Sequence, residues 1–175
     1  MKIVQELNYR NAIPVLNSIS PGLLNEIREI LTGRGNCLDL SKKGRQRDLS
    51  RQVQAWFIAR GWQSEVNCSA IPDMRYDLIK DKVPIEIELG HQRLVFPDFF
   101  KFLADYSKQT IPAAIMIVTG KPMLFGNNWH CSIESTKRKI QAVKEVFLVP
   151  LLVIGIDPDE NDVSIGLPTP SSGNV

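Results

Sequence analysis

Three acidic residues lie close together in the sequence RYDLIKDKVPIEIELGHQ, residues 75–92. Eight residues separate Asp77 from Glu86, and a single residue separates Glu86 from Glu88. Side chains alternate between the two faces of a β-strand, so Glu86 and Glu88 would share one face of a strand here. The other face would be apolar and would carry Ile85, Ile87 and Leu89. The pattern therefore predicts a strand with two carboxylates on one side.

A cation is one explanation for this crowding of acids. If Asp77 lies on the neighbouring strand of a hairpin, its carboxylate comes close to that of Glu86, and the acids repel one another unless a cation lies between them. Oxygen ligands of this kind suit Mg²⁺, which is usually bound by one or two carboxylates together with phosphate oxygens and water. The alternative is an ordinary half-buried strand whose polar face is solvated. The spacing alone leaves both interpretations open.

The elements around the acids predict a mixed sheet. Three short segments joined by PD and KD turn signals predict an antiparallel meander: WQSEVNCSAI, MRYDLIKD and KVPIEIELG. Apolar residues at helical spacing predict helices at 20–33 and 48–61 before the meander. After it, helices near 96–103 and 135–146 alternate with the apolar strands AAIMIV and FLVPLLVIGI. The expected fold class is α/β (α+β), with a mixed five-stranded sheet flanked by helices.

Composition limits the classes of protein that fit. A chain of 175 residues with 43% hydrophobic and 23% charged residues can form one domain with its own core, predicted at 1–167. Residues 168–175 are rich in Pro, Ser and Gly and are predicted to be a flexible tail. Three cysteines without C-x-x-C spacing indicate reduced thiols and a cytoplasmic protein. The longest apolar stretch is too short for a membrane span, which argues against a membrane role.

A basic cluster is a candidate for binding nucleic acid. The net charge is only +2, so attraction to DNA must come from local clustering of Lys and Arg. One such cluster leads into the second predicted helix and contains Lys42, Lys43, Arg45, Arg47 and Arg51. These side chains would neutralise DNA phosphates, or they would simply form the solvated start of a helix. The sequence does not decide between the two.

The acidic segment resembles the signature of the PD-(D/E)XK nucleases. Asp77, eight intervening residues and then Glu86-x-Glu88 are similar to the variant in which the usual Lys is replaced by an acid or an amide, as in type II restriction endonucleases of the BamHI and BglII kind. The resemblance to the BglII-like group extends to the opening MKIVQELNYRNAIPVLN, the LLNEIREIL helix, the FPDFFKFL helix and the VPLLVIGIDP strand. It covers nearly the whole chain.

The resemblance implies roles for the matching residues. Asp77 and Glu86 would ligate Mg²⁺ with the carbonyl of Ile87, and Glu88 would orient or deprotonate the attacking water. The catalytic residues would then be Asp77, Glu86 and Glu88, in a restriction endonuclease-like fold. The reaction would be hydrolysis of a DNA phosphodiester that leaves a 5′-phosphate.

The resemblance favours a Mg²⁺-dependent type II restriction endonuclease, acting on double-stranded DNA as a homodimer at a palindromic site. Two alternatives remain open. The first is a nuclease of DNA repair or recombination with the same core, and the second is a degenerate, non-catalytic relative that binds DNA. Retention of the three acids speaks against the second, because a decayed site would be free to lose them.

Overall fold

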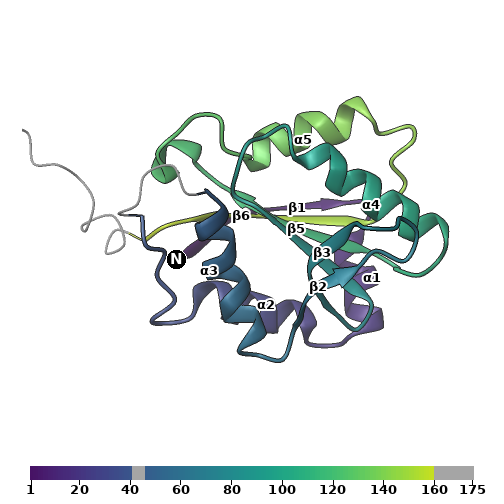
Figure 1. Cartoon of the computed structure of the whole chain (residues 1–175), viewed down its shortest axis with the longest axis horizontal. Helices are drawn as coiled ribbons and strands as arrows, with labels where there is room; N and C mark the ends of the chain where they lie inside the picture. Colours follow the sequence, from purple (N-terminus) through teal and green to yellow (C-terminus); the bar gives the residue numbers. More distant parts are fainter. Residues whose placement is uncertain (41–45, 160–175) are drawn as a thin grey trace, which may run out of the picture.

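The computed structural model describes residues 1–40 and 46–159, and a six-stranded sheet runs through its centre (Figure 1). The strands are β1 Lys2–Tyr9, β2 Gln63–Asn67, β3 Arg75–Lys80, β4 Val83–Glu88, β5 Ala114–Thr119 and β6 Leu151–Asp157. The helices are α1 Ala12–Ile19, α2 Leu23–Thr32, α3 Gln46–Ile58, α4 Val95–Ser107 and α5 Ile133–Ala142, with a short 3₁₀ helix, η1, at Pro122–Phe125. The predicted tail at 168–175 and part of the basic cluster lie outside the described residues.

The strand order is β1-β6-β5-β4-β3-β2. β4, β5 and β6 are parallel, whereas β2 pairs antiparallel with β3, β3 with β4, and β1 with β6. The mixed sheet and the antiparallel meander of β2, β3 and β4 confirm the predicted architecture. The predicted number of five strands was wrong, because the sequence pattern did not reveal β1. Most side chains of β1 are exposed or half-buried, so the strand lacks the apolar alternation by which strands are recognised.

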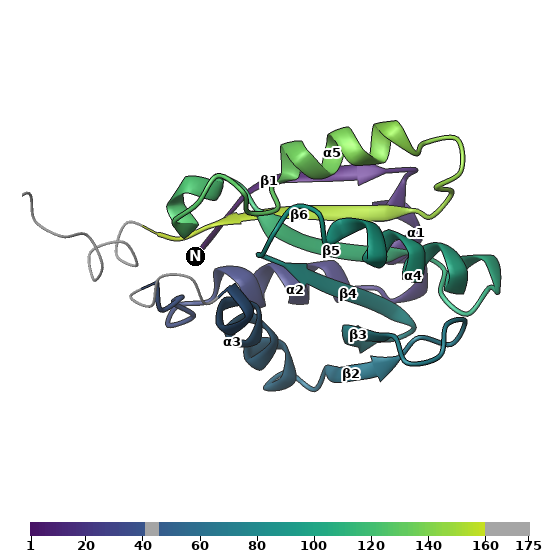
Figure 2. The same cartoon turned by 45° about the horizontal axis from the view of Figure 1, so that its top comes forward.

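Helices cover both faces of the sheet (Figure 2). α1, α2 and α3 pack on one face in a core that includes Ile85, Ile87 and Leu89. α4 and α5 pack on the other face, in a second core. β5 and β6 are buried along their whole length, as their continuous apolar sequences predict. The acidic face of β4 therefore points toward the layer that contains α4.

The helices start one to three residues away from the predicted positions. α5 begins at Ile133, two residues before the expected position, because Ser132 and Ser135 form a reciprocal capping box. The sequence analysis did not predict α1, which lies directly before α2. On α4, Phe99 and Phe102 are buried, but Phe96 and Phe100 are exposed, so only part of its aromatic surface belongs to the core.

Two further features concern the cysteines and the length of the helices. Cys37, Cys68 and Cys131 all lie within the described residues, and no disulfide joins them. Within the described residues, no helix combines the length and the apolar character that crossing a membrane requires.

Candidate active site

The β3–β4 hairpin brings the three acids together. Its two-residue turn consists of Asp81 and Lys82, both with positive φ, which is the conformation that joins antiparallel strands with the native twist. The strands pair from Lys80 with Val83 to Leu78 with Ile85, and just beyond this pairing Asp77 lies close enough to Glu86 for their charges to interact. The predicted hairpin of β3 and β4 is therefore confirmed. It follows from the local turn and from the alternation of side chains.

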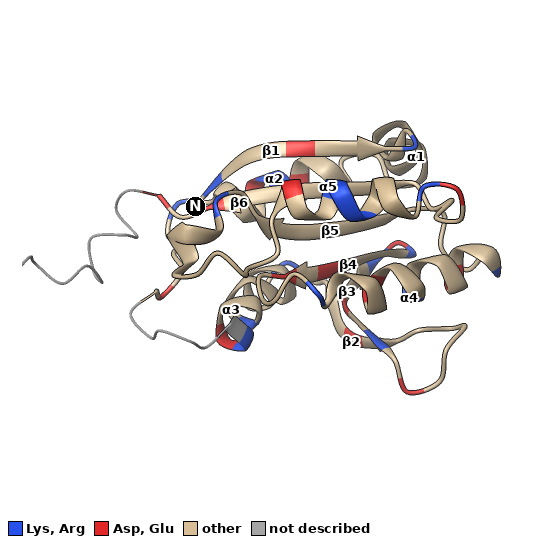
Figure 3. Cartoon of the chain, turned by 90° about the horizontal axis from the view of Figure 1, so that it is seen from above, with Lys and Arg blue, Asp and Glu red and all other residues tan. Residues whose placement is uncertain are grey.

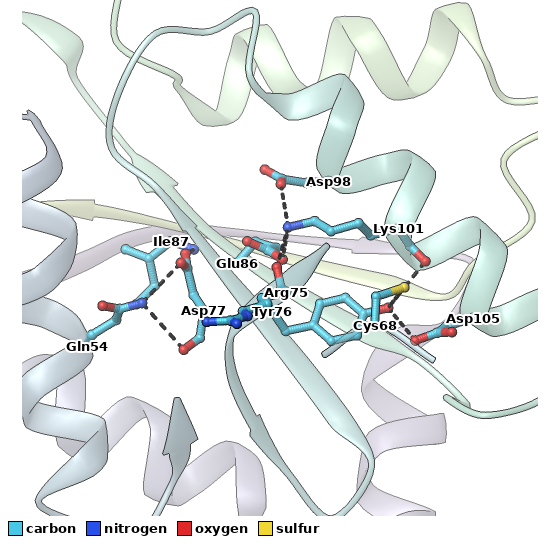
Figure 4. Close-up of polar contacts among 10 residues, drawn as sticks. All are labelled: Gln54, Cys68, Arg75, Tyr76, Asp77, Glu86, Ile87, Asp98, Lys101 and Asp105. Atoms are coloured by element: carbon cyan, nitrogen blue, oxygen red, sulfur yellow. Dashed lines mark hydrogen bonds and ion pairs between the residues drawn. The ribbon is translucent and has the colours of Figure 1, made fainter. Parts of the chain in front are cut away.

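Both oxygens of the Asp77 carboxylate have protein donors (Figure 4). The backbone N–H of Ile87 donates to Oδ2 at 2.7 Å, and Nε2 of Gln54 donates to Oδ1 at 3.0 Å. Burial raises the pKa of Asp77, and the hydrogen bond from Ile87 opposes that shift. These bonds fix the direction of the carboxylate, so Asp77 is oriented before any ligand binds.

Glu86 is buried, with 4% of its surface exposed. The solvated-strand interpretation is therefore wrong for this residue. Burial raises the pKa of Glu86 strongly, and the charges of Asp98 and Asp77 add to the shift, whereas Lys101 opposes it. The ammonium of Lys101 contacts Glu86 Oε1 directly. Glu86 is thus an acid held inside the protein beside a cation from another element.

Glu88 lies at the end of β4 and is half-buried. Its Oε1 accepts a hydrogen bond from the backbone N–H of Gly90 at 2.7 Å. Burial and the nearby charge of Asp98 raise the pKa of Glu88 to about 7. A group with a pKa near neutrality exchanges protons readily at neutral pH, which is the property of a general base.

The N-terminal half of α3 supports the strand from the other side. Ser50 and Gln54 are four residues apart and share one face of α3. Ser50 Oγ donates to the carbonyl of Ile87 at 2.9 Å, and Gln54 holds Asp77. A carbonyl oxygen has two lone pairs, so the oxygen of Ile87 retains the capacity for a second partner.

The donor set around Asp77 fits Mg²⁺. It consists of two carboxylates and one carbonyl, all of them oxygen ligands. No group of three or more His, Cys, Asp or Glu side chains that could hold a metal occurs in residues 1–40 and 46–159. A divalent ion here would therefore need oxygens from water or substrate, as Mg²⁺ sites on phosphate substrates usually do.

The structure adds two charged residues that the sequence did not reveal. Asp98 and Lys101 lie three residues apart on α4 and form an ion pair of 3.1 Å. Lys101 Nζ also donates to the backbone carbonyl of Arg75 at 2.9 Å. The negative charges of Glu86 and Asp98 outweigh the effect of burial and raise the pKa of Lys101. Both residues lie among the buried residues of α4, between Val95 and Phe102. Charged residues at apolar positions of a helix are the sequence feature that could have identified them.

A buried tyrosine connects α4 to β3. The hydroxyl of Tyr76 donates to Asp105 Oδ2 at 2.9 Å, and the backbone N–H of Ser69 donates to the same oxygen at 3.0 Å. Tyr76 directly precedes Asp77, whereas Asp105 lies one turn beyond Lys101. This contact therefore sets the position of α4, and of its two charged residues, relative to the acidic strands.

The predicted DNA-binding residues are only partly within the described residues. Lys42, Lys43 and Arg45 lie outside them. Arg47 and Arg51 are exposed on α3, the helix that also carries Ser50 and Gln54. Figure 3 shows basic positions on α3, and the acidic segment of β4 between α3 and α4. Two positive side chains are thus presented on the helix that contacts the acidic site.

Comparisons with known proteins show the family of the chain and match its fold. A family model described as restriction endonuclease BglII/BglIII matches residues 4–156. The crystal structure of restriction endonuclease BglII complexed with a DNA 16-mer is similar, with a TM-score of 0.72 and 17% identity, over 91% of this chain and 78% of that one. The crystal structure of free BglII has a TM-score of 0.63 and 19% identity, over 91% of this chain and 81% of that one. The comparison with curated proteins gave no match.

Proposed function

This chain belongs to the BglII/BglIII restriction endonuclease family, and from this premise we propose that it is a Mg²⁺-dependent type II enzyme. Its substrate would be double-stranded DNA with a specific, palindromic recognition site. The observation that carries the proposal is the convergence of Asp77, Glu86 and Glu88 at the end of the β3–β4 hairpin away from its turn, in an environment that holds each carboxylate in a fixed direction.

The acids take different roles because their surroundings differ. Asp77 and Glu86, with the carbonyl of Ile87, would hold Mg²⁺ beside the scissile phosphate. The metal would lower the pKa of a bound water and offset the negative charge that develops on the phosphate. Glu88 lies on the same face as Glu86 but at the half-exposed end of the strand, where substrate and solvent can reach it.

Glu88 is the residue that would act on the water. Its carboxylate accepts a proton from the water as the water oxygen attacks phosphorus in line with the 3′ oxygen. The bond between phosphorus and the 3′ oxygen then breaks, and the 3′ oxygen takes a proton from solvent. The products are a 5′-phosphate and a 3′-hydroxyl. The bond from Gly90 orients the carboxylate of Glu88 for this step.

Contacts with the DNA backbone are assigned to the basic cluster. Arg47 and Arg51 on α3 would contact phosphates, together with Lys42, Lys43 and Arg45 in the preceding segment. Because α3 also contacts Asp77 and Ile87, DNA bound along this helix would lie close to the acids. Cleavage of both strands of a palindrome requires one active site for each strand, so a two-fold symmetric homodimer follows from the proposal.

A single experiment separates the proposed activity from the alternatives. The purified chain is incubated with phage and plasmid DNA in Mg²⁺, and the fragment ends are sequenced. We expect discrete fragments with one shared sequence at every end, and no fragments with Asp77→Asn. A smear, or preference for branched DNA, would favour a repair or recombination nuclease. DNA binding by the folded chain without any cleavage would favour the non-catalytic relative.

A further inference from the structure

The ammonium of Lys101 lies among three oxygen atoms and faces the ring of Tyr76, 5.7 Å from the ring centroid. Its neighbours are Glu86 Oε1, Asp98 Oδ1 at 3.1 Å and the carbonyl of Arg75 at 2.9 Å (Figure 4). Two carboxylates and a carbonyl are the ligands that proteins offer to hard divalent ions. Here the same ligands hold a side-chain cation. The cluster is therefore a cation position that the chain itself fills.

All three N–H groups of the Lys101 ammonium have an acceptor in this position. An ammonium has three N–H donors, and the three oxygen atoms provide one acceptor for each. Lys101, Asp98 and Glu86 are all buried, with exposed fractions of 6%, 8% and 4%. Within the described residues, Lys101 also supplies the only cationic group that contacts Glu86. Solvent ions do not reach this place without displacing the side chain.

Glu86 separates this position from the side on which Asp77 lies. Figure 4 shows Asp77 and Lys101 on opposite sides of Glu86, with Asp77 held from α3 and Lys101 reaching in from α4. Glu86 thus has two places where a cation can bind. One faces Asp77 and is the proposed Mg²⁺ site, and the other contains the ammonium.

We propose that Lys101 is the resident second cation of the active site: it occupies the place beside Glu86 and Asp98 where a second divalent ion would otherwise bind. The inference rests on the proposed function only for the role of the Asp77 side. Lys101 is a positioning residue, since it contacts Glu86 through Oε1. The consequence is that removal of the ammonium creates a new divalent-ion site.

The test is a count of bound ions on the full chain without DNA. Mn²⁺ binding is measured by equilibrium dialysis and by electron paramagnetic resonance for wild type and for Lys101→Ala. We expect Lys101→Ala to bind one ion more per chain than wild type at the same Mn²⁺ concentration. Lys108→Ala, at the exposed end of the same helix, is the matched control and should bind the wild-type number. Asp98→Asn combined with Lys101→Ala should lose the extra ion.

Two other ion counts would overturn the inference. Equal ion counts for wild type and Lys101→Ala would show that the position does not accept a divalent ion. Binding of two ions by wild type would show that Lys101 is displaced. If Lys101→Ala does not fold without metal, circular dichroism in saturating Mn²⁺ decides: recovery of the fold supports replacement of the ammonium by the ion, and failure to recover excludes it. The proposed cleavage activity has a separate readout, DNA fragments, so either idea can fail alone.

Discussion

At the scale of single residues, Asp77 and Glu86 should separate folding from activity. We expect Asp77→Asn and Glu86→Gln to reduce cleavage by more than about 100-fold, because even residues that only orient metal ligands cost about 10–100-fold when removed. Both amides keep hydrogen-bonding groups where the carboxylates are, so the fold should persist. Cleavage of a plasmid measures the first effect and circular dichroism the second. Wild-type rates for either variant would remove the active-site assignment.

The ion pair between Glu86 and Lys101 determines how Glu86→Ala should change the stability of the chain. Repulsion among the acids alone predicts that Glu86→Ala stabilises the chain without metal. The structure reverses this expectation, because Glu86 is ion-paired with Lys101. Breaking a buried ion pair from one side usually costs about 3–5 kcal/mol. Lys101 retains Asp98, so the low end of that range is expected for the free energy of unfolding. Chemical denaturation of Glu86→Ala and Glu86→Gln checks the difference.

Glu88 should give the chain a characteristic dependence on pH. Burial raises the pKa of Glu88 to about 7, so the folded chain favours its neutral form. The stabilisation by this group is full below the pKa of an unfolded Glu, about 4.3, and is lost as the pH rises toward 7. Without metal, the melting temperature of the chain should therefore fall over this range. Glu88→Gln should flatten the decline, and an unchanged profile would contradict the assignment of the shift to Glu88.

Ionisation of Glu88 should also determine how the cleavage rate rises with pH on the acidic side. The base must be ionised to accept a proton from water, so cleavage should rise with pH through a midpoint at or below about 7, because bound Mg²⁺ favours the ionised form. Glu88→Ala should lose about 10²–10⁴-fold in rate, the usual contribution of a positioned base. Glu88→Gln and Glu88→Lys should keep part of the activity if orientation of the water is the main role. In both variants the rise of the cleavage rate with pH should disappear.

The three acids were predictable because their relation is local. Alternation along β4 and a two-residue turn fix Asp77, Glu86 and Glu88 relative to one another. Lys101 and Asp98 were not predictable in the same way. Their helical spacing is visible in the sequence, but which strand α4 packs against is decided by the burial of residues such as Phe99 and Phe102. A charged residue that is brought to the site by tertiary packing produces no periodic pattern in the sequence.

At the scale of elements, Tyr76 fixes α4 against β3. We expect Tyr76→Phe to destabilise the chain by about 1–3 kcal/mol, because the hydroxyl that donates to buried Asp105 is lost and no water replaces it easily. Because α4 carries Lys101 and Asp98, cleavage should also decrease. Tyr106→Phe, on the same helix, removes a hydroxyl from a half-buried site and is the matched control. Equal stability of the two variants by denaturant unfolding would contradict the role of this contact.

The sequence failed to predict β1 because the strand pairs over a long range. β1 pairs with β6, from Lys2 with Asp157 to Tyr9 with Leu151, so its partner lies at the opposite end of the described chain. As an edge strand it has one neighbour, and the mixture of polar and apolar residues along it, none of them fully buried, is compatible with solvent on the other side. By contrast, the buried strands β5 and β6 were evident from continuous apolar runs. Long-range pairing of a polar strand is a property of the assembled sheet.

At the scale of the whole molecule, the small net charge makes the placement of arginines decisive. If Arg47 and Arg51 each contact one phosphate, the double Ala variant should lower the slope of log K against log salt by about 1.8, at about 0.9 for each phosphate contact. Binding to a non-specific duplex in EDTA, followed at several salt concentrations, measures the slope. Arg60→Ala is the control, because Arg60 is exposed just beyond the other end of α3. An equal loss with Arg60→Ala would indicate only a general charge effect.

The pairing of active sites is the last property of the whole molecule that can be tested directly. In a homodimer, each chain cuts one strand, so a dimer of one wild-type chain and one Asp77→Asn chain has one working site. We expect a mixture with excess Asp77→Asn to convert double-strand cleavage of a plasmid into nicking, after the two proteins have been allowed to exchange chains. Sedimentation with and without DNA that contains the recognition sequence should show the dimer at least on DNA. If the wild-type chain acts as a monomer, the inactive variant only competes for DNA, and the proportion of nicked to linear product stays constant as total cleavage falls. That constancy, together with a monomer on DNA, would exclude the dimeric mechanism while leaving the assignment of the acids intact.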